Sequence, residues 1–437
     1  MRIDHGVSKQ AGLSFEQAPP FSIPLRFFIT APFFLLAGAV LVLLAPEALS
    51  SRWTPQALAL THALTLGFLA MVMLGALMQM LPVVAGAALP SPRIVAWFTH
   101  VPLVAGTIAL MAGFLGAGSV MIVVGVFLLG MCFALFLVAA GISLARAASN
   151  VTVTGIRLAT VCLGLTVALG LGLVLTHAGW WAMPEMLAAR AAHPAIGLLG
   201  WAMLLVISVA YQVVPMFQIT PPYPQRVARW LTSAIFILLM LHSTAPLLPG
   251  ATQVPVDRIA EDGLAAAILI FAITTLRIQS HRRRKLPDIT LDFWRAGMGS
   301  LILCVVVWLT GQLCPRWGGS DGYPLLLGVL FIGGFAVSVV NGMLYKIVPF
   351  LAWFHLQAQL QARAGTIPNM KQMIAEPWMR AQFGAHLAAC ALLAAAVFWP
   401  HLFTIPAAII LGLSALLLEI NLLSSVRHYL RHGGRLT

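Results

Sequence analysis

The sequence predicts an all-α polytopic membrane protein with twelve transmembrane helices arranged as three pseudo-threefold four-helix units. The first observation is composition: 60% of the 437 residues are apolar and 8% are charged, whereas a soluble domain carries about 25% charged residues. The second is a series of twelve long apolar runs, and the third is a motif that occurs three times. Together they exclude a soluble enzyme, a nucleic-acid-binding module and a disordered chain.

Apolar runs bounded by proline, glycine or charged residues place the helices, since one span needs roughly 20 apolar residues. We expect them at about 26–45, 57–81, 93–115, 119–146, 152–175, 194–216, 227–248, 258–278, 292–314, 323–349, 380–399 and 402–428. They form one membrane domain over 26–430, with repeat units at about 26–148, 150–280 and 290–430. A segment over 1–25 precedes this domain and a tail over 431–437 follows it. Asp4, Glu16 and Pro19 interrupt the first segment, so no cleavable signal peptide is expected.

The net charge of +13 is explained by topology. If the N-terminus is cytoplasmic, 21 of the 25 lysines and arginines fall on the cytoplasmic side and only Arg52, Arg190, Arg258 and Arg316 fall outside. The positive-inside rule then predicts that both termini are cytoplasmic, in a bacterial-type inner membrane. The expected partner of these charges is the lipid bilayer, with anionic head groups, and not nucleic acid.

The internal repeat is carried by the second, sixth and tenth helices. Each contains a proline, at Pro82, Pro215 and Pro349, and the two intervals between these prolines differ by a single position. A small residue precedes each proline by seven positions and a polar residue precedes it by three. Three helix ends in the same register indicate three equivalent units, and we expect these helices to be the inner members.

Four histidines near the outer ends of helices are the candidate ligands: His62, His177, His193 and His242. His62 and His193 precede Pro82 and Pro215 by nearly the same number of positions, so they occupy near-equivalent heights on equivalent helices. Ionisable groups at membrane depth usually face the bundle interior. A neutral imidazole is a ready ligand for haem iron or copper. The alternative is that each histidine hydrogen-bonds a neighbour at the membrane boundary.

This arrangement resembles the catalytic subunit of the haem–copper oxidase superfamily, and most closely its short, stand-alone NnrS-like members. Those members bind haem and copper and are linked to nitric oxide metabolism. The resemblance implies that His62 ligates a haem b, that His193 matches the first copper ligand of the sixth helix, and that His242 matches one member of the copper-binding pair of the seventh.

The chain also departs from that family's pattern. Ala195, Ile196 and Gly197 follow Pro194 where the family has glutamate, valine and tyrosine, and the tenth helix has no histidine between Tyr323 and Pro349. A terminal oxidase is therefore not expected. We expect a single haem b on His62, with His193, His242, His177 or a methionine opposite it, and the sequence leaves copper at His193 and His242 open.

A second candidate feature is a proton path through the cytoplasmic half of the bundle. Lys346 and Glu419 are charged residues well inside predicted spans, where such groups are costly. A path leading outward is completed by polar residues of the repeat motif and its neighbours, namely Tyr345, Tyr211, Gln212 and Gln79. The alternatives are a structural ion pair or a lysine that extends to the cytoplasmic face.

The sequence thus predicts a haem-binding membrane protein that handles electrons or a small gas such as nitric oxide. Whether it is an enzyme stays open, and if it is one it is an oxidoreductase. No cytochrome domain is fused to the chain, so electrons would come from a quinol or a separate cytochrome. The alternative is a transporter without a cofactor, although transporter repeats are usually twofold. The oligomeric state stays open.

Overall fold

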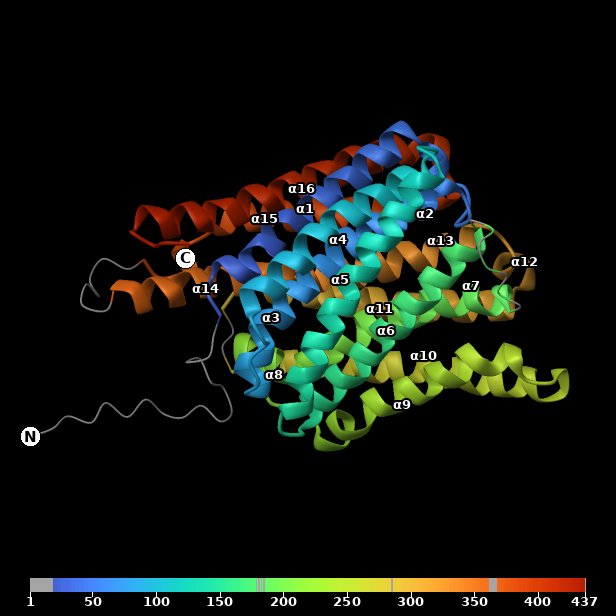
Figure 1. The fold of residues 1–437 in the computed structure, drawn as a ribbon, viewed down its shortest axis with the longest axis horizontal. Coiled ribbons are helices and arrows are strands. Elements are labelled where there is room, and N and C mark those ends of the chain that lie inside the picture. Colours follow the sequence, from blue (N-terminus) through green and yellow to red (C-terminus); the bar gives the residue numbers. More distant parts are fainter. Residues whose placement is uncertain are drawn as a thin grey trace, which may run out of the picture.

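The computed structural model describes residues 19–177, 179, 181, 183, 185–283, 286–360 and 368–436. Within these residues the chain is all-helical, and twelve helices are long and apolar enough to span a membrane. This confirms the predicted fold class. The helices run side by side along the long axis of the bundle (Figure 1). Because each segment is helical, its backbone polar groups are hydrogen-bonded within the segment, as a bilayer requires.

The first four spans are α1 (Ser22–Leu44), the composite α2 (Pro55–His62), η3 (Ala63–Ala70) and α3 (Met71–Ala85), then α4 (Pro92–Phe114) and α5 (Ser119–Arg146). The next four are α6 (Val151–His177), the composite α7 (Met186–Ala195), η4 (Ile196–Met203) and α8 (Leu204–Gln218), then α9 (Gln225–Thr244) and α10 (Gly250–Ser280). The last four are α11 (Ile289–Leu313), the composite α13 (Gly322–Gly328), η6 (Val329–Val337) and α14 (Ser338–Leu360), then α15 (Glu376–Phe398) and α16 (Pro400–Arg431).

The three units join into a closed ring. Helix α5 of the first unit packs on α6 of the second, α10 packs on α11 of the third, and α16 returns to pack on α1. Figure 1 shows α1 and α16 lying side by side although they are the first and the last helix of the chain. The same junction therefore occurs three times, which fits the threefold arrangement.

A π-helical segment interrupts the second, sixth and tenth spans at the same place. The segments η3, η4 and η6 all end at one common distance before Pro82, Pro215 and Pro349, and their starting points differ by at most one position. The helices continue beyond the prolines, so these residues lie inside helices instead of ending them. Because π-helices are rare and are often found at functional sites, this shared register indicates equivalent positions in the three units.

Each π segment contains a glycine at a fixed distance before the proline, and this glycine lies against the first helix of its unit. A Cβ atom added at Gly67 would overlap the Phe34 ring, one at Gly200 would lie 2.7 Å from Cys162 Sγ, and one at Gly334 would overlap Ser300 Oγ. At these glycines the backbone of the inner helix therefore lies directly against side chains of the neighbouring helix. The hydrophobic effect does not drive helices together in lipid, so they associate through close van der Waals packing, which small residues at such crossings allow.

We expect Gly67→Ala to destabilise the protein, because its new methyl group has no space beside Phe34. Overpacking of this kind costs about 1–3 kcal/mol. The matched control is Gly328→Ala on an inner helix of the third unit, where nothing lies within 4 Å of the added Cβ. Thermal unfolding of the purified protein in detergent checks this, and equal melting temperatures for the two variants would contradict the glycine-mediated packing.

Candidate functional site

The structure brings His62 and His193 together. His62 is the last residue of α2 and directly precedes η3, while His193 lies in α7 shortly before η4. Their ring centroids are 6.3 Å apart and their planes differ by 21°. Both rings are partly buried. Two histidines from different units thus face one site at the N-terminal ends of two π segments.

Each imidazole is held through the same nitrogen. His62 Nδ1 donates to the carbonyl oxygen of Leu58 at 2.8 Å, and His193 Nδ1 donates to the carbonyl oxygen of Thr166 on α6 at 3.0 Å. A carbonyl only accepts, so Nδ1 carries the proton in both rings and Nε2 keeps its lone pair. A second hydrogen bond that fixes tautomer and orientation in this way is typical of histidine ligands to metals.

A glycine lies beside the His193 ring and a phenylalanine beside the His62 ring. A Cβ atom added at Gly170 of α6 would lie 2.9 Å from His193 Cε1, so the ring occupies the space that a side chain would fill there. The Phe114 ring lies 5.3 Å from that of His62. An imidazole nitrogen binds a transition-metal ion at about 2.0–2.1 Å, so two rings whose centroids are 6.3 Å apart are close enough to hold one ion between them. The donor set therefore fits a haem iron or a copper ion.

His242 lies in a separate cluster. Its Nδ1 is 2.6 Å from Asp257 Oδ1, and with Glu261 the three ligand atoms lie within 4.8 Å of one another. Among the described residues this is the only cluster of three or more histidine, cysteine or carboxylate ligands, and it does not include His193. The sequence left open a copper ion shared by His193 and His242, and the cluster around His242 does not include His193. The side chain of His177, where α6 ends, lies outside the described part of the chain.

The predicted proton-path residues fall into three groups. Lys346 Nζ pairs with Asp288 Oδ2 at 3.0 Å, at the start of α11. Tyr345 donates to Gln382 at 3.2 Å and accepts from Asn421 at 2.8 Å, which joins three spans of the third unit. The remaining residues of the path are Glu419, Tyr211, Gln79 and Gln212.

Two of these remaining residues meet where the three inner helices converge. Gln79 and Gln212, each at the polar position of the repeat motif, line a cavity of about 50 Å³ together with Ile347 and Phe350. The volume suits one or two water molecules and is too small for a larger solute. Gln79 Oε1, Tyr211 Oη and Glu419 Oε2 are buried without a hydrogen-bond partner in the described chain, which favours water beside them.

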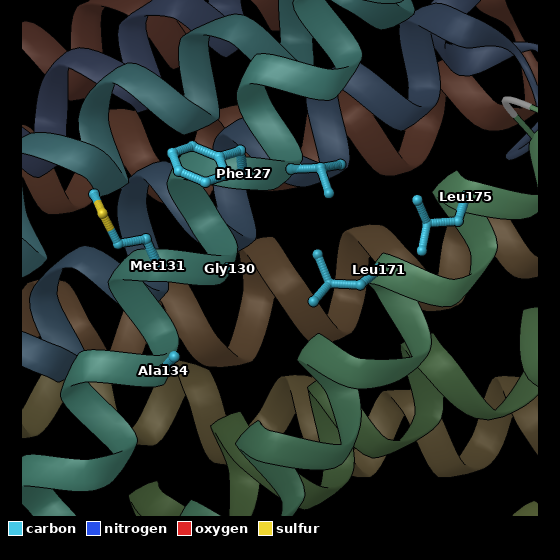
Figure 2. Close-up of a pocket in the computed structure, with 7 residues that line it drawn as sticks. Phe127, Gly130, Met131, Ala134, Leu171 and Leu175 are labelled. Carbon is cyan, nitrogen blue, oxygen red and sulfur yellow. The ribbon is translucent and has the colours of Figure 1, made fainter. Parts of the chain in front are cut away.

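A groove of about 420 Å³ lies between α5 and α6 (Figure 2). Phe127 and Met131 approach it from α5, and Leu171 and Leu175 approach it from α6. Its lining is apolar and open to the outside of the bundle, so it offers no group for chemistry, and lipid chains are expected to fill it. Helix α6 thus presents Leu171 to this groove and Gly170 to His193.

Four contributors to these sites were not predicted from the sequence. Asp257 and Glu261 were not considered as ligands, although their spacing of four positions puts both carboxylates on one helix face. Asp288, the partner of Lys346, was not considered. The Thr166 carbonyl left no trace in the sequence, because a backbone group that holds a ring from another helix is chosen by packing alone.

Comparisons with known proteins extend to the fold only. No protein-family model matches the chain, and no curated protein matches it. Among solved structures it is similar to a chain of a haem–copper terminal oxidase dimer determined by cryo-EM, with a TM-score of 0.58 over 94% of this chain and 84% of that one. The chain has a haem–copper oxidase-like fold. The identity of 14% shows the fold alone. This agrees with the fold that the sequence resemblance implies, whereas the NnrS-like subgroup stays a prediction.

We expect Lys346→Met to destabilise the protein, because it leaves the half-buried Asp288 carboxylate without its cation. The expected loss is about 1–2 kcal/mol, between the values for exposed and buried pairs. The double variant Lys346→Met with Asp288→Asn should recover most of that loss. Thermal unfolding of both checks it, with Arg380→Met, whose ion pairs are exposed, as the control. A double variant no more stable than the single one would contradict the pairing.

Proposed function

We propose that the protein is a haem b-binding membrane protein of the inner membrane that handles electrons or a small gas such as nitric oxide. The single observation that carries this proposal is the His62–His193 pair, because each ring is anchored through Nδ1 and keeps Nε2 for a ligand bond. The haem–copper oxidase-like fold supports it, as does the resemblance of the sequence to NnrS-like proteins.

The roles of the chain's own residues follow from this geometry. His62 and His193 would hold the iron, and the Leu58 and Thr166 carbonyls would keep both imidazoles in the Nδ1–H tautomer. Haem, when bound, would supply a one-electron centre, and a small gas could bind there only if one of the two imidazoles left the iron. Gly170 keeps space for the His193 ring. Two imidazoles of this kind also suit copper, which is the alternative occupant of the same pair.

The pair differs in one respect from the site implied by the resemblance. There the second helix shares its haem with the tenth, whereas here the neighbour of His62 is on the sixth span. The positions of the third unit that correspond to His62 and His193, counted back from Pro349, are Val329 and Leu327. The third unit therefore offers no equivalent ligand, which is why we propose one centre and no terminal oxidase activity.

Protons would reach the interior through the cytoplasmic half. The cavity at Gln79 and Gln212 and the buried hydroxyl of Tyr211 are polar positions on the inner helices. Tyr345 adds a continuous set of hydrogen bonds in the third unit. We propose that water joins these groups and that Lys346 serves structure through its pair with Asp288. An electron donor would be a quinol or a separate cytochrome.

Absorption spectroscopy of the purified protein tests the haem assignment. We expect a Soret band and a low-spin spectrum, and His62→Ala and His193→Ala should each abolish the low-spin signal, because each removes one of the two imidazoles that would hold the iron. The control is His242→Ala, which removes a histidine outside the pair and should leave the spectrum unchanged. A wild-type sample without a Soret band, or a low-spin spectrum that survives both substitutions, would refute the haem proposal. Bound copper without haem would identify the alternative occupant.

The orientation has its own test. The distribution of lysine and arginine predicts that both termini are cytoplasmic. A green fluorescent protein fused after Thr437 should be fluorescent, and alkaline phosphatase fused at the same point should be inactive. An active phosphatase fusion would reverse the proposed topology.

A further inference from the structure

A second metal site lies apart from the histidine pair. We propose that His242 of α9 and Asp257 and Glu261 of α10 bind one divalent transition-metal ion, represented by Zn²⁺. The three ligand atoms lie within 4.8 Å of one another, which is the spacing that three ligands around one ion require. This proposal is independent of the haem proposal, because it shares no residue with the His62–His193 pair.

The local packing sets these three side chains in place. Asp257 and Glu261 are four positions apart and so lie on one face of α10. Leu238, one turn before His242 on α9, lies against Gly263, where a Cβ atom would be 2.8 Å from the leucine methyl carbon. The close approach at Gly263 brings the two helices together beside the ligands. His242 Nδ1 then lies 2.6 Å from Asp257 Oδ1.

The charges around the cluster favour a cation. Arg258, which follows Asp257 in the chain, pairs with Asp262 at 3.4 Å and donates to Gln312 of α11. Among the described residues, no lysine or arginine forms an ion pair with Asp257 or Glu261. Two carboxylates that have a histidine but no lysine or arginine as an ion-pair partner repel each other at this distance. A divalent ion bound by these two carboxylates and a neutral imidazole gives a net charge of zero.

The donor set indicates which ions fit. One imidazole nitrogen and two carboxylate oxygens suit Zn²⁺ and related transition ions, and three protein ligands leave one position for water. Ca²⁺ takes six to eight oxygen ligands, and Mg²⁺ prefers six oxygens in an octahedron, so neither is matched by this set. The bound ion would join the outer ends of α9 and α10.

Zinc binding to the metal-depleted full-length protein in detergent tests the proposal. We expect one equivalent of Zn²⁺ to bind by isothermal titration calorimetry in the presence of excess Mg²⁺ and Ca²⁺, and to raise the melting temperature. Glu261→Gln, Asp257→Asn and His242→Ala should each weaken binding at least about tenfold. The matched control is Asp262→Asn, which removes the neighbouring carboxylate that pairs with Arg258 and should leave zinc affinity unchanged.

Additional measurements separate the outcomes. The His62→Ala/His193→Ala double variant should still bind the zinc equivalent, and Glu261→Gln should leave any haem spectrum unchanged, so that failure of one site does not imply failure of the other. If His242→Ala does not fold, zinc K-edge absorption of the wild type still reports the ligands, which should be nitrogen and oxygen without sulfur. Equal zinc affinity in Glu261→Gln, Asp257→Asn and wild type would overturn the proposal, as would equal competition by Ca²⁺.

Discussion

The close crossing between the first and second helix of each unit is the constraint on which the rest of the structure depends. In lipid, apolar side chains gain little by leaving one apolar neighbour for another, so helices associate through packing at short distance. Gly67, Gly200 and Gly334 allow that distance in the three units. The crossings hold the second, sixth and tenth spans at the centre, and the other helices close the ring around them.

The π segments at these crossings connect packing with the candidate site. A π-helix sacrifices regular hydrogen bonding, and its cost is offset only where the surrounding contacts favour it. Here each segment contains the glycine of the crossing, so the wider turns lie where the neighbouring helix is nearest. His62 and His193 stand at the beginning of two such segments. Helix packing and ligand placement therefore share one local departure from the α-helix.

The three repeat units share a backbone arrangement but carry different side chains at equivalent positions. The first two units each contribute a histidine to one pair, and the third has aliphatic residues at those positions. The third unit instead carries the buried hydrogen bonds around Tyr345 and the Lys346–Asp288 ion pair. In the second unit, α9 and α10 add a carboxylate cluster that has no counterpart in the sequence motifs. Equivalent backbone positions thus hold different chemistry.

The sequence by itself determined the twelve helices, the inner role of three of them and the shared height of His62 and His193, because hydropathy and spacing along a helix are local properties. It also contained the glycines at one fixed distance before each motif proline, although their meaning depends on which helix lies opposite. Only the tertiary structure decided that His62 faces His193, that Lys346 pairs with Asp288, and that His242 joins two carboxylates. These pairings depend on the rotation and depth of neighbouring helices, which packing sets and no single helix encodes.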